Sequence, residues 1–168
     1  MNPTWIIRTG RLVLSPVHGT DRAELRALKA DPAVFAVMLG GVRTHDQADR
    51  ELAEEVCAWG ANGYGLWAVR DQATDALVGL TGLQARADGR GIALRFAFRP
   101  AAQGRGLARE AAGAALRYGH ERAGLTRIVA VAREENIASR TLLGGLGMIE
   151  AEHFVQSGYG MVLFEHKM

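Results

Sequence analysis

Apolar residues in the first third of the chain follow the spacing of one strand and two helices. The alternation of apolar and less apolar residues at 11–17 predicts an opening strand. A helix is expected over 21–31, because this segment begins with an aspartate and ends before a proline. A second helix is expected over 44–59, where Thr44 and Gln47 match a capping box.

Three further apolar runs lie between turn signals. The runs at 65–69, 77–83 and 92–98 predict strands, and turn-forming residues occupy 71–75 and 87–91. Short connections of this kind join antiparallel neighbours. The middle of the chain is therefore expected to form an antiparallel meander.

After residue 98 the pattern changes to alternating helices and strands. An alanine-rich segment that follows Gly106 and ends at Gly124 predicts a long helix, whose small residues allow close approach to a sheet. The run at 128–132 is wholly apolar, which indicates a central strand. The last expected elements are a helix over 136–146 and strands over 148–154 and 159–165.

The composition is typical of a globular protein with one core. The chain has 168 residues, of which 48% are hydrophobic and 23% charged, so one domain over 1–168 is expected. A net charge of +2 without a run of lysines and arginines argues against nucleic-acid and membrane partners. A single Cys57 and an N-terminus without signal-peptide character favour a cytoplasmic location. The five histidines are scattered, so no metal site is expected.

Segment 103–108, Gln-Gly-Arg-Gly-Leu-Ala, carries the clearest chemical signal. Its glycines let the backbone turn tightly at the start of the long helix, whose first N–H groups have no partner within the helix. These donors and the positive end of the helix suit an anion, and Arg105 and Arg109 add positive charge. A ligand with several phosphates is the best match, although the glycines alone fit an ordinary loop equally well.

Two common phosphate-binding motifs are excluded. Arg109 stands where the dinucleotide fingerprint G-x-G-x-x-G requires its third glycine. No Gly-Lys-Ser or Gly-Lys-Thr of a Walker loop occurs anywhere in the chain. The expected ligand is therefore neither a dinucleotide nor a nucleoside triphosphate.

Segment 103–108 also resembles the acyl-coenzyme A pyrophosphate loop of the GNAT acetyltransferases. That loop has glutamine or arginine, two variable residues, glycine, one variable residue, and then glycine or alanine. Further segments resemble the branch of this family that includes the ribosomal-protein N-terminal acetyltransferases RimJ and RimL: 8–14, 65–69, 78–83, 136–139 and 146–148. The resemblance extends over nearly the whole chain.

The resemblance implies an α/β fold of the α+β kind, with a mixed, twisted, mostly antiparallel sheet of about six to seven strands and helices on both faces. The fourth and fifth strands would splay apart to admit the pantetheine arm of acetyl-coenzyme A. The implied activity is acetyl transfer to a primary amine by direct attack in a ternary complex. A non-catalytic acyl-coenzyme A sensor is the alternative, because Ala93 replaces a glutamate that many relatives have in the fourth strand.

The resemblance also assigns the residues that bind acetyl-coenzyme A. Backbone groups of the fourth strand would bind the two amides of the pantetheine arm, and one of its N–H groups would stabilise the developing oxyanion. Segment 103–108 would bind the diphosphate. The assigned residues are Phe96, Ala97, Phe98, Gln103, Gly104, Arg105, Gly106, Leu107, Ala108 and Asn136.

Ser139 is the candidate general acid, by resemblance to enzymes in which a serine or tyrosine near this helix faces the sulfur. In the alternative interpretation, Asn136 caps the helix and Ser139 is a first-turn residue without chemical function. The general base stays unassigned. Water relayed to Glu54, Glu55 or Glu135 is one option, and a weakly basic α-amino group that needs little help is another.

The acceptor amine is left open between a small molecule and a peptide, with specificity expected in 32–64. Trp59, Trp67 and Tyr159 fit either an acceptor pocket or the core, and the core is the commoner place for such residues. His120 is expected on a solvated face of the long helix. A homodimer is one option for the oligomeric state.

Overall fold

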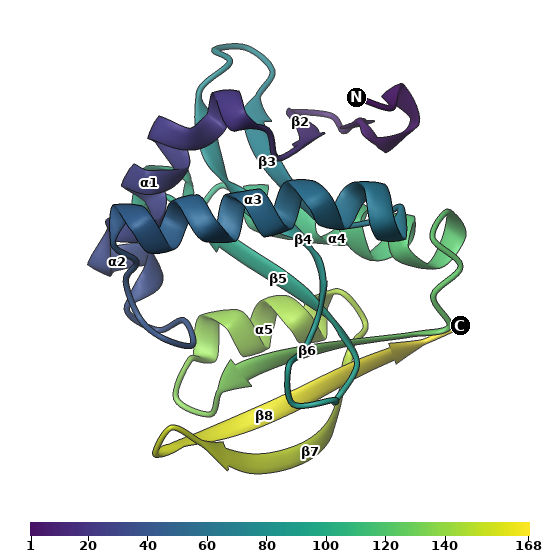
Figure 1. The fold of residues 1–168 in the computed structure, drawn as a ribbon. Coiled ribbons are helices and arrows are strands. Elements are labelled where there is room, and N and C mark those ends of the chain that lie inside the picture. The colour runs from purple at the N-terminus through teal and green to yellow at the C-terminus, as the bar shows by residue number, and fades with distance from the viewer.

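One eight-stranded sheet organises the computed structural model, which describes residues 1–168 (Figure 1). The strand order is β1-β2-β3-β4-β5-β6-β8-β7, and only the β5–β6 pair is parallel. The strands are β1 (Ile7–Arg8), β2 (Leu12–Pro16), β3 (Leu66–Asp71), β4 (Leu77–Ala85), β5 (Ile92–Phe98), β6 (Arg127–Arg133), β7 (Ile149–Gln156) and β8 (Tyr159–Lys167). The helices are α1 (Arg22–Ala30), α2 (Pro32–Phe35), α3 (His45–Asn62), α4 (Leu107–Glu121) and α5 (Ile137–Gly145).

All seven strands expected from the apolar pattern form, and β2 to β5 make the expected antiparallel meander. The eighth strand, β1, has only two residues, which are too few to show an alternation. The short helix α2 was also not expected. Pro32 was interpreted as a stop signal, but it opens a new helical turn, and the Asp31 side chain caps that turn by accepting the Ala33 N–H at 2.9 Å.

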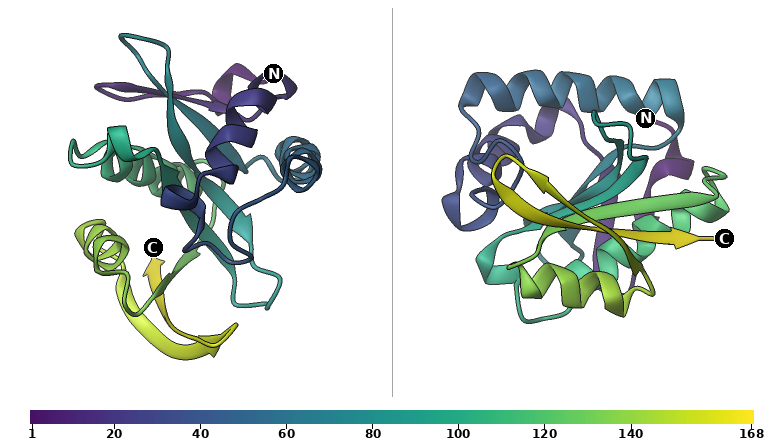
Figure 2. Two further views of the ribbon diagram at one scale, coloured as in Figure 1. Left: turned by 90° about the vertical axis from the view of Figure 1, so that its left-hand side faces the viewer. Right: turned by 90° about the horizontal axis from the view of Figure 1, so that it is seen from below.

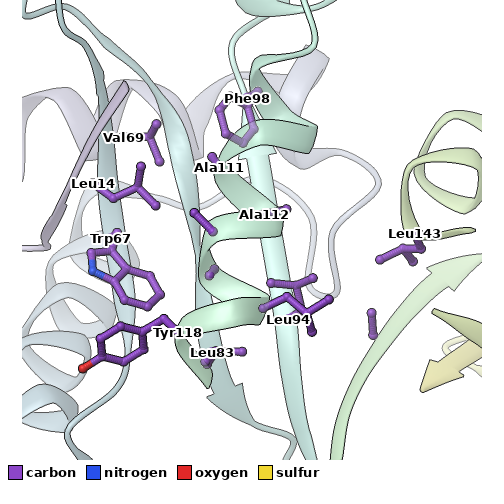
Figure 3. Close-up of a cluster of buried hydrophobic side chains, with 14 of the residues drawn as sticks. Leu14, Trp67, Val69, Leu83, Leu94, Phe98, Ala111, Ala112, Tyr118 and Leu143 are labelled. Carbon is purple, nitrogen blue, oxygen red and sulfur yellow. The ribbon is translucent and has the colours of Figure 1, made fainter. Parts of the chain in front are cut away.

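Helices cover both faces of the sheet (Figure 2). The helices α1, α2 and α3 pack on one face, and α4 and α5 lie on the other. The small residues Ala111, Ala112 and Ala115 of α4 are completely buried, and Figure 3 shows Ala111 and Ala112 among the side chains of the sheet. None of the helices has the length and apolar character that a membrane span requires.

Trp59 and Trp67 belong to the core, which was the commoner of the two places considered for them from the sequence. Trp59 and Trp67 are 2% and 0% exposed, and they pack edge-on against each other and against Tyr118. Their indole N–H groups donate to the backbone oxygens of Leu66 and Trp5, respectively. Burial of these large side chains therefore leaves no buried indole donor unsatisfied.

The expectation for His120 was wrong. Its side chain is buried at 8% exposure, with Nδ1 2.6 Å from the Leu125 carbonyl oxygen and Nε2 3.0 Å from Nδ1 of His166. The end of β8 covers this face of α4. The local helical pattern gives no information on such a distant strand.

The parallel pair β5–β6 is joined at one position only, Ala93 opposite Val129. Beyond it β5 continues to Phe98 and β6 to Arg133, and the two strands diverge (Figure 1). The other edge of β5 is paired with β4 along its whole length. The expected splay between the fourth and fifth strands of the family's fold is therefore confirmed at β5 and β6.

A substitution at Gly82 would test the close packing of β4 against the backbone at Gly65 and Leu66. A Cβ atom at this position would lie 2.3 Å from the Gly65 carbonyl oxygen and 2.6 Å from the Leu66 Cα, so backbone would have to move. Overpacking of this kind costs about 1–3 kcal/mol, so Gly82→Ala is expected to lower the thermal midpoint by roughly 3–12 °C. Gly60→Ala on the exposed side of α3 is the matched control, since nothing lies within 4 Å of its Cβ position and alanine favours helix. Calorimetry showing Gly82→Ala as stable as Gly60→Ala would contradict this packing.

Candidate active site

A cavity of about 1210 Å³ opens where β5 and β6 diverge. One end is formed by the segment before α4 and by α5, and the other by α2, α3 and the end of β4. The sequence-predicted residues that line it are Phe96, Ala97, Phe98, Gln103, Gly104, Gly106, Leu107, Ala108, Asn136 and Ser139. Arg105 does not line it, because its side chain is 52% exposed and lies 3.9 Å from the Asp71 carboxylate.

The turn before α4 depends on two glycines. Gly104 and Gly106 have φ angles of +77° and +74°, in the left-handed region where a side chain is unfavourable. Gly106 precedes α4 and offers no side chain to cap it. The N–H groups of residues 107–109 have no hydrogen-bond partner in the protein, and Glu110 is the first residue to donate back, to Gly106 at 3.1 Å. An unpaired row of donors therefore borders the cavity, which suits an anion.

Arg11 and Glu110 hold this turn against the β1–β2 hairpin. Arg11 donates through Nη1 to the Arg105 carbonyl oxygen at 2.6 Å and through Nε to Glu110 Oε2 at 2.8 Å. Glu110 Oε1 accepts the Thr9 hydroxyl at 2.6 Å and the Arg11 backbone N–H at 2.9 Å. Sequence reasoning missed this clamp, because its two members are 99 residues apart and form no motif.

The contacts with Thr9 and Arg11 lower the pKa of the Glu110 carboxyl group. Burial alone raises the pKa of Glu110, but hydrogen bonds from the Thr9 hydroxyl and from the Arg11 backbone and guanidinium outweigh it. The net result is a pKa below the ordinary value of 4.5. Glu110 is therefore ionised at neutral pH and binds Arg11 as a carboxylate.

Arg109, which was expected to add positive charge beside the turn, lines the cavity and also ties α4 to α5. Its Nη2 donates to the Gly145 carbonyl oxygen at 2.9 Å. The two helices that border this end of the cavity are thus linked through one side chain.

Part of the β5 backbone faces the cavity. Arg99 donates its N–H to the Val78 carbonyl oxygen of β4 at 2.9 Å. Because alternate residues of an antiparallel pair face the partner strand, Ala97 also turns its backbone groups to β4. Phe96 and Phe98 turn theirs to the diverging side, where β6 does not pair with them. The cavity is therefore bordered by backbone groups of Phe96 and Phe98 but not by those of Ala97.

The start of α5 lies across the cavity from β5. The Asn136 side chain caps this helix by accepting the Ser139 N–H at 3.2 Å. The Ser139 side chain is half-buried, its hydroxyl makes no hydrogen bond within the protein, and it lines the cavity. The capping role is thus observed for Asn136, and the same geometry leaves the Ser139 hydroxyl free.

The three carboxylates considered as a base occupy different places. Glu54 is exposed and lies outside the cavity, and Glu135 is an exposed residue on its rim. Glu55 lines the cavity and is only 4% exposed. The strand β5 itself contains no acidic residue, and Ala93 packs against Val129 in the core.

Glu55 belongs to a buried charged cluster that sequence reasoning did not identify. The Lys29 ammonium is 2% exposed and lies 2.8 Å from Glu55 Oε1 and 2.8 Å from Glu51 Oε2. Arg43 Nε lies 2.5 Å from Glu51 Oε1. These residues come from α1, α3 and the segment between α2 and α3, and no spacing in the sequence relates them.

The aromatic candidates for an acceptor pocket lie elsewhere. Trp59 and Trp67 are core residues, and Tyr159 is an exposed residue of β8 whose ring carries the Arg133 guanidinium at 3.6 Å. None of the three lines the cavity. No cluster of three or more histidine, cysteine, aspartate or glutamate side chains with metal-site geometry occurs in the chain.

Comparison with known proteins gives one family and one fold. The model of the acetyltransferase (GNAT) domain matches residues 11–149. A GNAT-family acetyltransferase from Bordetella pertussis is 28% identical, with a TM-score of 0.85, over 95% of this chain and 98% of that chain.

Two more distant structures share the fold. The α-N-acetyltransferase RimL, a ribosomal-protein enzyme with coenzyme A bound, is 14% identical, with a TM-score of 0.81, over 97% of this chain and 98% of that chain. A spermidine N-acetyltransferase from Vibrio cholerae is 19% identical, with a TM-score of 0.74, over 95% of each chain. The names of these two proteins point to different amines, so the shared fold does not define an acceptor.

The clamp predicts a pH-dependent contribution to stability. Glu110→Gln is expected to lower the thermal midpoint at pH 7, because it removes the charge that binds Arg11. Since the pKa of Glu110 is lowered in the folded protein, its stabilisation is present above the ordinary value of 4.5 and is lost as the pH falls through the folded value. The difference in midpoint between wild type and Glu110→Gln should therefore shrink below pH 4.5. The exposed Glu54→Gln is the control and should show no difference, and a Glu110 difference that grows towards acid pH would contradict the clamp.

Proposed function

The chain belongs to the GNAT acetyltransferase family, and we propose that it transfers the acetyl group of acetyl-coenzyme A to a primary amine. The observation that carries this proposal is the single cavity described above. The cavity extends from the unpaired N–H groups at the start of α4, along the unpaired edge of β5, to a charged end that is lined by Lys29, Arg43 and Arg95. Cofactor and acceptor can therefore meet within one enclosed space.

The residues at the cofactor end fit acetyl-coenzyme A. The N–H groups of residues 107–109 would bind the diphosphate, and the absence of side chains at Gly104 and Gly106 allows close approach to the backbone. Phe96 and the Phe98 N–H offer backbone groups to the amides of a pantetheine arm, whereas the Phe98 carbonyl oxygen already accepts the Gln103 side chain at 3.4 Å. The cavity volume of about 1210 Å³ exceeds the roughly 300–1,000 Å³ of a usual small-molecule pocket, so an acceptor has room as well.

Acetyl-coenzyme A supplies a thioester whose carbonyl carbon bonds to the amine nitrogen while the carbon–sulfur bond breaks, the electron pair leaves on sulfur and the amine releases a proton. The Phe96 N–H, on the edge of β5 that β6 leaves unpaired, would donate to an oxygen that gains negative charge. The free hydroxyl of Ser139, across the cavity, is the proposed proton donor to the sulfur.

Direct attack by the amine is supported because the cavity has no nucleophilic cysteine on which an acetyl-enzyme could form. It contains no cysteine that would carry the acetyl group, since the only one, Cys57, is exposed on α3. No carboxylate from β5 enters it either. An α-amino group, with a pKa near ~8, is partly neutral at physiological pH and needs little help from a base, so such an amine suits this cavity better than a lysine side chain.

Gly106→Val tests the cofactor site. A β-branched residue is strained at a φ angle of +74°, and its side chain would stand in front of the N–H groups that bind the diphosphate. We expect calorimetric titration to show loss of acetyl-coenzyme A binding. Gly158→Val is the matched control, because Gly158 has a similar φ angle of +79° in the β7–β8 turn and does not line the cavity. Unchanged affinity in Gly106→Val would refute the cofactor site.

Ser139→Ala tests the proton donor. Alanine keeps the backbone N–H that Asn136 accepts, so α5 should stay capped and the cofactor affinity unchanged. The turnover number is expected to fall by on the order of 10²-fold, because departure of the thiolate loses its acid. Release of free thiol from acetyl-coenzyme A with a panel of amines measures this effect. Equal turnover by both proteins would remove Ser139 from the mechanism, and no release by wild type with any amine would favour an acyl-coenzyme A sensor.

A further inference from the structure

Arg95 is the one cation at the charged end of the cavity without a carboxylate partner. Its Nη1 donates to Gln84 Oε1 at 2.5 Å, and no carboxylate oxygen lies within 4.0 Å of the guanidinium. The neighbouring cations Lys29 and Arg43 are both paired with glutamates, and Arg86 is paired with Asp88. The Arg95 guanidinium thus makes a single hydrogen bond, to the neutral side-chain amide of Gln84.

The environment of Arg95 is unfavourable for its charge. Burial lowers the pKa of Arg95, and the nearby charges of Glu55 and Glu51 offset this only in part, because Arg43 and Arg86 oppose them. A guanidinium in such a place gains from a planar anion that accepts two of its N–H groups. A carboxylate has this shape and charge.

Glu55 offers the complementary feature in the same cavity. Its Oε1 binds Lys29, whereas its Oε2 is buried and has no hydrogen-bond partner within the protein. A buried carboxylate oxygen without a donor is costly, and an N–H from a ligand would satisfy it. The charged end thus holds one cation without a carboxylate partner and one buried carboxylate oxygen without a donor.

We infer that the amine acceptor carries a carboxylate close to its primary amine, with Arg95 as the residue that binds the carboxylate and Glu55 facing the amine. Free α-amino acids have this chemistry, and so do peptides with an acidic residue near the N-terminus. The inference rests on the proposed function. Arg95 and Phe96 line the same cavity, so a carboxylate bound at Arg95 would share that cavity with the proposed site of acetyl transfer. The products are the N-acetylated acid, coenzyme A and one proton.

The charge balance at this end disfavours a polyamine. The four cations Lys29, Arg43, Arg86 and Arg95 face three carboxylates, those of Glu51, Glu55 and Asp88, which leaves one positive charge in excess. The excess positive charge would repel an acceptor that itself carries several positive charges. An acceptor with a carboxylate neutralises the excess.

The decisive comparison is between acids and their amides. Thiol release would be measured for the α-amino acids other than proline and cysteine, for the same compounds as carboxamides, for peptides with aspartate or asparagine as second residue, and for spermidine. An amide loses the carboxylate and also has a less basic amine, so each kcat/KM is calculated for the neutral amine; the aspartate and asparagine peptides differ little in the basicity of their amine. We expect at least one acid to exceed its amide in kcat/KM by about 10–100-fold, the gain of a charge-assisted hydrogen bond of about 1.5–3 kcal/mol. Comparing the free amino acids with the aspartate peptides shows whether the preferred carboxylate belongs to a free amino acid or to a peptide.

Arg95→Gln should remove this preference. Its kcat/KM for the preferred acid is expected to fall by about 10–100-fold, through KM, while that for the amide stays the same. Arg95→Lys keeps the charge and should restore part of the preference. Arg86→Gln is the matched control, because Arg86 lines the same cavity but already binds Asp88, and it should leave the ratio of acid to amide unchanged.

The outcomes separate the two proposals. Amides, asparagine peptides or spermidine that react as well as the acids would overturn the assignment of Arg95 and leave the acetyltransferase function intact. A preference for acids that persists in Arg95→Gln would also overturn it. Failure of every amine to release thiol from a protein that binds acetyl-coenzyme A would overturn both proposals. Calorimetric titration of acid and amide into the protein saturated with coenzyme A gives an independent readout, in which the acid should bind about 10–100-fold more tightly than the amide.

Discussion

The divergence of β5 from β6 is the constraint on which the rest of this structure depends. Two parallel strands normally continue side by side, because every unpaired backbone group in a protein interior costs free energy. Here the pair is joined at one position, Ala93 opposite Val129, and the free edge of β5 then borders a cavity. The chain supports the opening from outside, with β4 along the other edge of β5, α4 against one face and α2 against the other.

The sequence predicted what depends on local pattern. Alternating apolar runs predicted seven of the eight strands, and the glycines of segment 103–108 indicated the turn at the start of α4. The resemblance to a known family extended this prediction to the splayed strands. These signals were strong because each involves residues within a few positions of one another, so the physical cause is visible in the spacing.

What the sequence could not predict depends on distant residues. His120 looked like a surface residue of a helix, but β8 covers it, and Arg11 gave no sign that it would hold Glu110. The same holds for the Lys29 cluster, which combines three separate segments. Arg95 belongs to none of the motifs found in the sequence. Its lack of a carboxylate partner could be found only after the neighbouring charges had been placed.

Because the sheet is joined at only one position between β5 and β6, α4 carries much of the connection between its two sides, with Arg109 bonded to α5 and His120 to β8. On one side lie β1 to β5, and on the other β6, β8 and β7 with α5 (Figure 2). A ligand bound between β5 and α5, as proposed above, would add contacts across this opening. It would raise the free energy of unfolding by an amount that grows with the logarithm of the ligand concentration. The stability of the protein would then increase with the supply of the ligand.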